Sequence, residues 1–203
     1  MTQPHIVLLD NFDSFTYNLV DQFRSLGCSV TVYRNSLSAA QVEAAIDQAI
    51  ADNAKPVLVL SPGPGAPADA GCMPELITRL RGKVPMIGIC LGHQAIVEAY
   101  GGTVSGAGDI VHGKSAMMRH NHHPVFGDLA SPLSIARYHS LIAQDVPSDL
   151  RVIADVDGLV MAVTHDHDRV CGYQFHPESI LTTQGAQLLT NTLAWVMSSP
   201  GQH

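Results

Sequence analysis

The sequence has few charged residues and no excess of basic ones. Charged residues make up only 14% of the 203 residues, and 11 Lys and Arg against 18 Asp and Glu give a formal net charge of −7. Nucleic acids and anionic membranes attract basic surfaces, so neither is expected as the main partner. The sequence also lacks an apolar run of about 18 residues and a signal peptide after Met1. These absences predict a cytoplasmic protein.

Cysteines are few and widely spaced. They are Cys28, Cys72, Cys90 and Cys171. No Cys-x-x-Cys pair occurs among them, so neither a disulfide framework nor a zinc knuckle is indicated. Two groups of histidines have the spacing of metal ligands, but no cysteine pair and no His-Glu-x-x-His helix accompanies them. We expect no metal site and interpret these histidines as solvated loop residues: His120, His122, His123, His165 and His167.

Hydrophobic residues make up 46% of the sequence, which is enough for a substantial core. We expect one domain over residues 1–203, with its core over residues 5–196 and a disordered tail at 198–203. In the first half, apolar runs alternate with segments of helical periodicity. This alternation predicts a flavodoxin-like α/β fold, in which helices flank a central, mostly parallel (mixed) sheet.

The expected strands of the first half are His5–Asp10, Cys28–Tyr33, Pro56–Leu60 and Pro85–Ile89. Helices are expected to begin at the N-caps Ser14 and Ser38, to cover Cys72–Leu80, and to run from His93 to Tyr100. Beyond Gly101 the segments become short and β-like, which predicts a meander that forms a small antiparallel β extension before a closing helix. These segments are Ser115–Arg119, Leu133–Tyr138, Leu150–Asp155, Leu159–Thr164, Val170–Phe175 and the helix Gln184–Met197.

The stretch Gly88-Ile-Cys90-Leu-Gly92 joins a buried strand to a helix. Glycines two residues before and two after a nucleophile are typical of a nucleophile elbow, here with cysteine in the place of serine. The turn would leave the thiol at a helix N-terminus, where unpaired N–H groups favour the thiolate. The alternative is that Cys90 only fills a gap in the core, since cysteine is often buried.

Two other segments could complete such a site at the carboxyl ends of the strands. Ser61-Pro-Gly-Pro-Gly65 is a stiff turn that could aim a glycine N–H at an oxyanion, although it also suits an ordinary tight turn. In the last strand, period 2 would place His176 and Glu178 on one face, where the carboxylate could orient the imidazole as a general base. Taken alone, this pair also suits a surface histidine with an acidic neighbour.

Together these segments resemble the class I (triad-type) glutamine amidotransferases. The resemblance covers roughly residues 5–196 and rests on Gly88-Ile-Cys-Leu-Gly-His-Gln94, Phe175-His-Pro-Glu178 and Ser61-Pro-Gly-Pro-Gly65. Further motifs are similar to the chorismate-utilising branch, above all to the glutaminase subunits (component II) of anthranilate synthases. These motifs are Leu9-Asp-Asn-Phe-Asp-Ser-Phe-Thr-Tyr17, Gly71-Cys-Met-Pro-Glu-Leu76, Tyr138-His-Ser-Leu141 and Ser179-Ile-Leu-Thr182.

The resemblance implies hydrolysis of L-glutamine through a γ-glutamyl thioester. Cys90 would be the nucleophile, His176 would carry the proton, and Glu178 would orient His176. The backbone N–H groups of Gly63 and Leu91 would form the oxyanion hole. The glutamine-binding residues would be Gly63, Pro64, Gly65, Gln94, Ser140 and Leu141.

The resemblance also implies a partner, namely a large chorismate-binding synthase subunit that receives the ammonia and holds Mg²⁺, with no cofactor in this chain. It implies contact with that subunit near Asp10–Tyr17, Gly65–Cys72 and Asp109–His112. Gly71-Cys-Met-Pro-Glu-Leu76 and Val97-Glu-Ala-Tyr100 favour tryptophan biosynthesis. The alternative is the folate branch, served by aminodeoxychorismate synthase, or a chain that serves both.

Two interpretations from other classes use the same elbow. A cysteine peptidase or γ-glutamyl hydrolase would turn over γ-glutamyl peptides without a partner, and the glutamine-binding motifs argue against it. A redox sensor on a flavodoxin-like scaffold would need the cysteine but no histidine–carboxylate pair. The presence of His176 and Glu178 with Cys90 therefore favours the amidotransferase.

Overall fold

The computed structural model describes residues 3–199 as a single α/β domain built on a nine-stranded sheet. The strand order is β2-β1-β3-β4-β11-β10-β9-β6-β7. The elements of the first half agree with the expected ones to within two residues at most ends. They are β1 (Pro4–Asp10), α1 (Thr16–Ser25), β2 (Ser29–Arg34), α2 (Ala39–Ala51), β3 (Lys55–Leu60), a 3₁₀ turn (Pro67–Asp69), α3 (Met73–Leu80), β4 (Met86–Ile89) and α4 (Leu91–Ala99).

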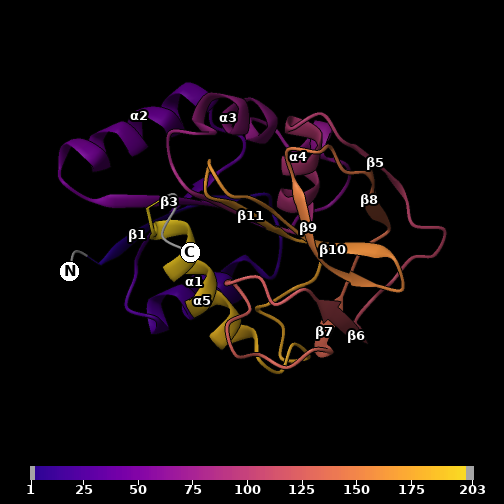
Figure 1. Ribbon diagram of the computed structural model, residues 1–203. Helices are drawn as coiled ribbons and strands as arrows, with labels where there is room; N and C mark the ends of the chain where they lie inside the picture. The colour runs from indigo at the N-terminus through magenta and orange to yellow at the C-terminus, as the bar shows by residue number, and fades with distance from the viewer. Residues whose placement is uncertain (1–2, 200–203) are drawn as a thin grey trace.

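The parallel half of the sheet lies between two layers of helices, with α2, α3 and α4 on one side and α1 and α5 on the other (Figure 1). Side chains alternate between the two layers, as period 2 requires. On β1, Ile6 and Leu8 belong to the cluster with α1 and α5, whereas Val7 and Leu9 belong to the cluster with α2 and α3. Burial on both faces accounts for the continuous apolar runs.

The second half of the chain widens the same sheet with antiparallel strands. The prediction of a small antiparallel extension is confirmed, and β10, β9, β6 and β7 continue the central sheet directly. The second-half elements are β5 (Thr103–Gly106), β6 (Lys114–His120), β7 (Leu133–Arg137), β8 (Leu141–Asp145), β9 (Arg151–Val156), β10 (Leu159–His165), β11 (Val170–Tyr173) and α5 (Gly185–Met197).

Two features of this half were not predicted. The prediction that all these strands form a meander is wrong for β11. This strand pairs parallel with β4 and antiparallel with β10, so it lies in the middle of the sheet. Strands β5 and β8 were not expected at all, and they form a separate two-stranded sheet. Both are short and only partly buried, so they lack the apolar run that marks a strand.

The predicted N-cap Ser14 is wrong, because α1 begins after Phe15 and has no side-chain cap. Aspartates order the turn before this helix instead. The Asp10 carboxylate accepts hydrogen bonds from Phe12 N (2.9 Å) and Thr16 Oγ1 (2.9 Å), and the Asp13 carboxylate accepts one from Phe15 N (2.8 Å). The loop that follows β1 is therefore held at the edge where the site is expected.

Part of the segment predicted to be disordered, 198–203, can be described. Ser198 Oγ donates to the carbonyl of Trp195, and the carbonyl of Ser199 accepts a hydrogen bond of 2.6 Å from Arg169. Residues 200–203 lie outside the described residues. Between residues 3 and 199 no helix is long and apolar enough to cross a membrane.

The predicted N-cap Ser38 is confirmed, and it forms a capping box in which Ser38 Oγ accepts from Gln41 N and the Gln41 side chain accepts from Ser38 N. Ser38→Ala should lower the free energy of unfolding by about 1 kcal/mol, because the helix loses a partner for its first N–H groups. The measurement is urea denaturation followed by circular dichroism. Ser36→Ala, at an exposed serine just before the helix, is the control and should change stability by less than about 0.5 kcal/mol. Equal losses in the two variants would contradict the capping role.

Candidate active site

Cys90 lies on a strained turn between β4 and α4. Its backbone has φ +52° and ψ −99°, a conformation that L-residues with a side chain rarely adopt. The N–H of Cys90 donates to the carbonyl of Tyr173 at the end of β11 (2.7 Å). The turn therefore has the geometry of a nucleophile elbow, with the thiol at the carboxyl edge of the sheet and at the N-terminus of α4.

The two glycines of the elbow are required by close packing. A Cβ on Gly88 would lie 2.6 Å from the backbone carbon of Gly92, and a Cβ on Gly92 would lie 2.4 Å from the carbonyl oxygen of Leu60 on β3. Neither distance is possible for a real side chain. The absence of side chains here lets α4 approach β3 and β4 closely enough for the sharp turn at Cys90.

His176 and Glu178 form a buried pair next to this turn. His176 Nδ1 and Glu178 Oε1 are 2.5 Å apart. The pair lies in the turn after β11, which ends at Tyr173, so the prediction that both residues share one face of a strand is wrong. The turn itself holds them, because His176 N donates to Ala136 O (3.0 Å) and Thr182 Oγ1 donates to His176 O (2.6 Å).

The electrostatics of His176 favour its protonated form. Burial lowers the pKa of this imidazole, but Cys90 and the Glu178 carboxylate outweigh burial and raise the pKa to about 10. Among the described residues His176 Nε2 has no hydrogen-bond partner, and the Cys90 thiol donates a long hydrogen bond of 3.9 Å to the carbonyl of Tyr138. The second ring nitrogen is thus available to take the proton of the thiol, and the raised pKa favours holding it there.

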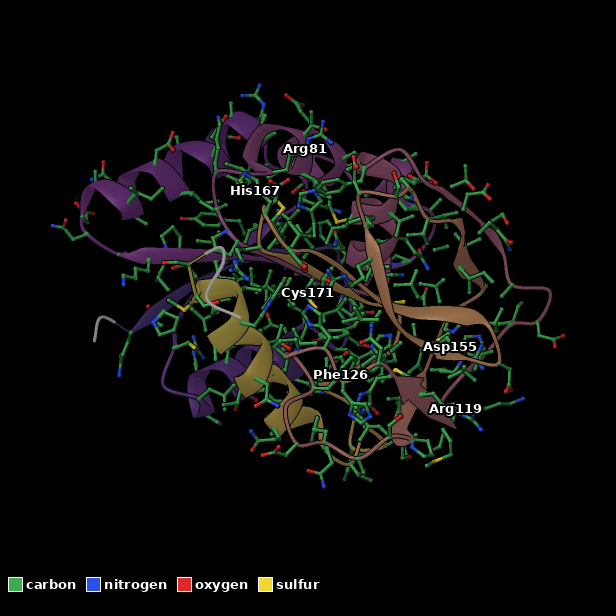
Figure 2. All side chains as sticks on the ribbon, viewed as in Figure 1. Arg81, Arg119, Phe126, Asp155, His167 and Cys171 are labelled. Carbon is green, nitrogen blue, oxygen red and sulfur yellow. The ribbon has the colours of Figure 1, made fainter. Side chains whose placement is uncertain are left out.

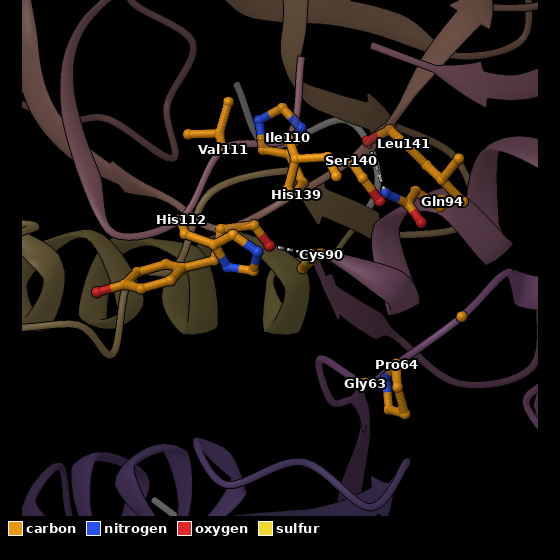
Figure 3. A pocket seen from close by; sticks show the side chains of 12 residues that line it. Gly63, Pro64, Cys90, Gln94, Ile110, Val111, His112, His139, Ser140 and Leu141 are labelled. Carbon is orange, nitrogen blue, oxygen red and sulfur yellow. Dashed lines mark hydrogen bonds between the residues drawn. The ribbon is translucent and has the colours of Figure 1, made fainter. Parts of the chain in front are cut away.

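The thiol faces a cavity of about 300 Å³. All six predicted glutamine-binding residues line it with Cys90: Gly63, Pro64, Gly65, Gln94, Ser140 and Leu141. Figure 3 shows Gly63 and Pro64 on one side of the cavity and His139, Ser140 and Leu141 on the other, with Cys90 and Gln94 between them. Gln94 Nε2 donates to the carbonyl of Leu141 (3.0 Å), which ties α4 to β8.

The predicted oxyanion residues are close neighbours. A Cβ on Gly63 would lie 2.9 Å from Leu91 Cδ2 and 2.6 Å from the Cβ of Asn11, so only glycine fits there. Leu91 is the first residue of α4, where the N–H groups lack partners within the helix. Backbone donors from the loop after β3 and from α4 can therefore converge beside Cys90.

Several side chains that shape the site were missed among the predicted site residues. Ile110, Val111, His112, Tyr138 and His139 also line the cavity. His139 is buried, and burial and then Arg137 lower its pKa to about 4, so the imidazole is neutral. Its Nε2 accepts from Arg137 Nε (3.0 Å). Tyr138 and His139 belong to the motif Tyr138–Leu141, so the sequence contained a pattern that could have identified them as site residues. Ile110 and Val111 belong to no such motif, and the sequence placed them only in the predicted contact loop.

The aromatic rings of Phe15 and Tyr138 cover His176, with ring centroids 5.3 Å and 5.0 Å from the imidazole. Tyr138 also lines both the cavity at Cys90 and a second one of about 590 Å³, which Glu178 lines too. His176 lines neither of these two cavities. The base is therefore enclosed by protein, which strengthens its interactions with charged neighbours.

The other cysteines differ from Cys90 in their surroundings. Cys171 lies on β11 in the interior of the molecule (Figure 2), and burial raises its pKa to about 12. All four cysteines are free thiols, but of these Cys90 alone is at the elbow and lines the cavity. This contrast argues against a simple core-filling role for Cys90.

The interpretation of the histidine groups as solvated loop residues is wrong for His120 and His123, which are buried. It is also wrong for His165, which is the last residue of β10 and packs against Tyr100 (ring centroids 4.9 Å apart). His120 stacks on Phe126 (ring centroids 4.1 Å apart) and bonds to the Ala130 carbonyl, while His123 packs edge-on against Trp195. Both are aromatic core residues beside α5. Within the described chain, no group of three or more His, Cys, Asp or Glu side chains is arranged to hold a metal ion.

Comparison with known proteins identifies the class to which this fold and site belong. The family model "Glutamine amidotransferase class-I" matches residues 7–195. The chain therefore belongs to the class-I glutamine amidotransferase family, and the resemblance inferred from its motifs is confirmed.

The sequence relatives carry a more particular name. The chain is 64% identical to "Anthranilate synthase component 2" of Vibrio parahaemolyticus over 193 residues, 95% of this chain and 96% of the relative. It is 50% identical to the protein of the same name from Haemophilus influenzae over 194 residues, 96% of this chain and 98% of the relative.

Solved structures support the fold. A glutamine amidotransferase from Thermotoga maritima has a TM-score of 0.76 at 14% identity, covering 98% of this chain and 100% of that one. A putative GMP synthase component from Thermoplasma acidophilum has a TM-score of 0.80 at 24% identity, covering 97% and 95%.

Gly92→Ala should damage the elbow, because the added Cβ overlaps the Leu60 carbonyl and forces α4 away from β3. We expect a loss of about 1–3 kcal/mol in the free energy of unfolding and slower alkylation of Cys90 by iodoacetamide. Gly106→Ala is the matched control, since a Cβ there meets nothing within 4 Å. A Gly92→Ala protein as stable and as reactive as the parent would show that the close approach is not required.

Glu178→Gln should lower the pKa of His176, because the neutral amide no longer stabilises the imidazolium. The pKa of His176 in the folded protein, about 10, lies above its ordinary value of 6.5. Protonation therefore stabilises the fold fully below pH 6.5, and this contribution is lost as pH rises through about 10. The substitution should thus destabilise more at pH 6 than near pH 10.5, as measured by denaturation, with the pKa followed by NMR. Glu98→Gln, at an exposed helical position, is the control; a His176 pKa that is the same in both variants would contradict the pairing.

Proposed function

We propose that the chain is the glutaminase subunit of an anthranilate synthase and supplies ammonia to a large chorismate-aminating subunit. One observation carries the proposal: strained Cys90 lines a cavity together with all six predicted glutamine-binding residues, and the buried His176–Glu178 pair lies next to Cys90. The names of the relatives from Vibrio parahaemolyticus and Haemophilus influenzae support the anthranilate synthase assignment.

The reaction begins with proton transfer from the Cys90 thiol to His176 Nε2. The thiolate attacks the side-chain carbonyl carbon of glutamine, a C–S bond forms, and the carbonyl oxygen becomes an oxyanion. The N–H groups of Gly63 and Leu91 stabilise this oxyanion. Glu178 accepts a hydrogen bond from His176 Nδ1, which fixes the ring orientation and stabilises the imidazolium.

Collapse of the tetrahedral intermediate breaks the C–N bond, and His176 returns its proton to the leaving nitrogen, which departs as ammonia. The γ-glutamyl thioester on Cys90 remains. Water then attacks the thioester with His176 as base, which releases glutamate and restores the thiol. The overall balance is glutamine plus water to glutamate plus ammonia.

The substrate would bind between the turn that follows β3 and the start of β8. Both N–H groups of the Gln94 amide are used within the protein, so its Oε1 is the atom left to accept a hydrogen bond from glutamine. Ser140 and Leu141 would hold the α-amino and α-carboxylate groups through their backbone. The turn with Pro64 and Gly65 would form the opposite wall of the cavity.

The partner would be a large chorismate-binding subunit that holds Mg²⁺, with no cofactor in this chain, and the complex would work in the cytoplasm. Apolar side chains in two of the expected contact segments support such an interface. Phe12 and Tyr17 are 53% and 72% exposed, and Ile110 in the loop over the cavity is 69% exposed. If the large subunit covers these exposed apolar side chains, it lies beside the site.

The anthranilate would serve tryptophan biosynthesis. Another relative, 51% identical, is named "Anthranilate synthase component 2, pyocyanine specific" in Pseudomonas aeruginosa, so proteins of this name serve more than one end product. The folate branch is the second candidate, and no relative named above supports it. A peptidase and a redox sensor are disfavoured by the family match and by the buried histidine–carboxylate pair.

Reconstitution distinguishes these functions. The chain is mixed with the large subunit of anthranilate synthase or of aminodeoxychorismate synthase, together with chorismate, Mg²⁺ and glutamine. We expect fluorescent anthranilate with the first partner. Product only with the second partner would move the chain to the folate branch, and full turnover of γ-glutamyl peptides without a partner would overturn the proposal.

Cys90→Ser should separate the two half-reactions in the reconstituted complex. Glutamine-dependent synthesis should fall about 1,000-fold or more, because the hydroxyl is a far weaker nucleophile at this site. Synthesis from ammonium chloride should persist, because free ammonia bypasses Cys90. Cys28→Ser, at a buried cysteine outside the cavity and outside the expected contact segments, is the control and should retain both activities. Glutamine-dependent activity that survives in Cys90→Ser would remove Cys90 from the mechanism.

A further inference from the structure

Gln174 is a fully buried polar residue that none of the predicted roles includes. It follows β11, two residues before His176, and its side chain is 0% exposed. Its Nε2 lies 3.6 Å from Cys90 Sγ, and its Oε1 accepts a hydrogen bond of 3.2 Å from Gln94 Nε2. One buried amide thus contacts both the sulfur of the elbow and a side chain of the glutamine cavity.

A backbone carbonyl fixes the polarity of this chain of hydrogen bonds. The carbonyl of Leu141 can only accept, so the atom of Gln94 that faces it, at 3.0 Å, must be the NH₂ group. The second N–H of that NH₂ group points to Gln174, which must therefore present its oxygen to Gln94. The NH₂ group of Gln174 is then left facing Cys90. The sulfur is consequently the acceptor in this contact.

We infer that Gln174 takes part in the reaction by donating a hydrogen bond to the thiolate of Cys90 and by orienting the amide of Gln94. The inference rests on the proposed glutaminase function and adds a residue to its site. An N–H donor stabilises a thiolate more than a thiol, because hydrogen bonds to charged acceptors are the stronger ones. No proton leaves Gln174: the thiol proton passes to His176 Nε2, and the N–H of Gln174 remains bonded to nitrogen.

The hydrogen bond from Gln174 to Cys90 opposes the effect of the Tyr138 carbonyl on the thiol. The carbonyl of Tyr138 accepts from the thiol at 3.9 Å, and a carbonyl oxygen close to sulfur favours the protonated form. Gln174 lies on the β11 side of the sulfur and supplies the donor that the Tyr138 carbonyl cannot. Since Gln94 keeps its hydrogen bond to Leu141 in any case, loss of Gln174 should affect the sulfur more than glutamine binding.

Two substitutions test the donor. Gln174→Glu keeps an oxygen for Gln94 but presents an anionic oxygen to the sulfur, and Gln174→Leu has a similar volume with no donor. The readout is the pH dependence of Cys90 alkylation by iodoacetamide, which needs neither glutamine nor a partner. Gln187→Glu makes the same chemical change at an exposed position on α5 and is the control.

We expect the alkylation profile to move to higher pH by about one unit or more in both Gln174 variants, more in Gln174→Glu, so that alkylation at pH 7 slows about tenfold. In the reconstituted complex, kcat/KM for glutamine should fall, with the larger part of the loss in kcat. The alkylation profile of Gln187→Glu should superimpose on the profile of the parent protein. Folded Gln174 variants whose profiles also superimpose on the parent would overturn the inference, because a purely structural role would change the amount of folded protein and leave the profile in place.

A measurement on the unmodified chain covers the case in which the variants do not fold. With ¹⁵N labelling, the side-chain amide protons of Gln174 should shift as Cys90 ionises and again when Cys90 is alkylated. Resonances that stay constant through both changes would refute the contact. These outcomes do not depend on which large subunit yields product, so a failed reconstitution and a failed role for Gln174 remain distinguishable.

Discussion

The site depends on how closely one helix approaches the sheet. Helix α4 lies against β3 and β4 because Gly88 and Gly92 place no side chain between them. This approach bends the chain at Cys90 into a positive-φ conformation that the surrounding packing has to maintain. Burial of the first two turns of α4 and the hydrogen bond from Cys90 N to the Tyr173 carbonyl hold it there. The position of the sulfur is thus set by packing, before any substrate arrives.

Around this fixed sulfur, the two halves of the sheet supply different parts of the site. The parallel half brings the loops after β1, β3 and β4 to one edge, which places backbone donors there. The antiparallel half supplies the wall of the cavity through the segment from Tyr138 to Leu141. Strand β11 pairs with a strand of each half, and the turn after it carries His176 and Glu178. Buried charge at His176 is tolerated because Cys90 and Glu178 offset the cost of burial.

Much of the fold and site could be predicted because the features concerned are local. The apolar runs of the parallel strands, the capping box at Ser38 and the glycines of the elbow each have a short sequence pattern. The rest depends on partners distant in sequence. The parallel pairing of β11 with β4, the burial of His120 against Phe126, and the contacts of Gln174 leave no local periodicity. The turn that joins His176 to Glu178 shows the same limit, since its residues suit a strand as well.

The position of β11 also bears on how the protein is made. The nucleophile follows β4, but the neighbour of β4 in the sheet is β11, so that Gly88 pairs with Gly172 from the far end of the chain. During synthesis Cys90 leaves the ribosome well before His176, and a central strand of the sheet is inserted last. Long-range parallel pairing of this kind is slow. A nascent chain therefore carries the nucleophilic cysteine without its base, and it becomes able to cleave glutamine only when the whole sheet has closed.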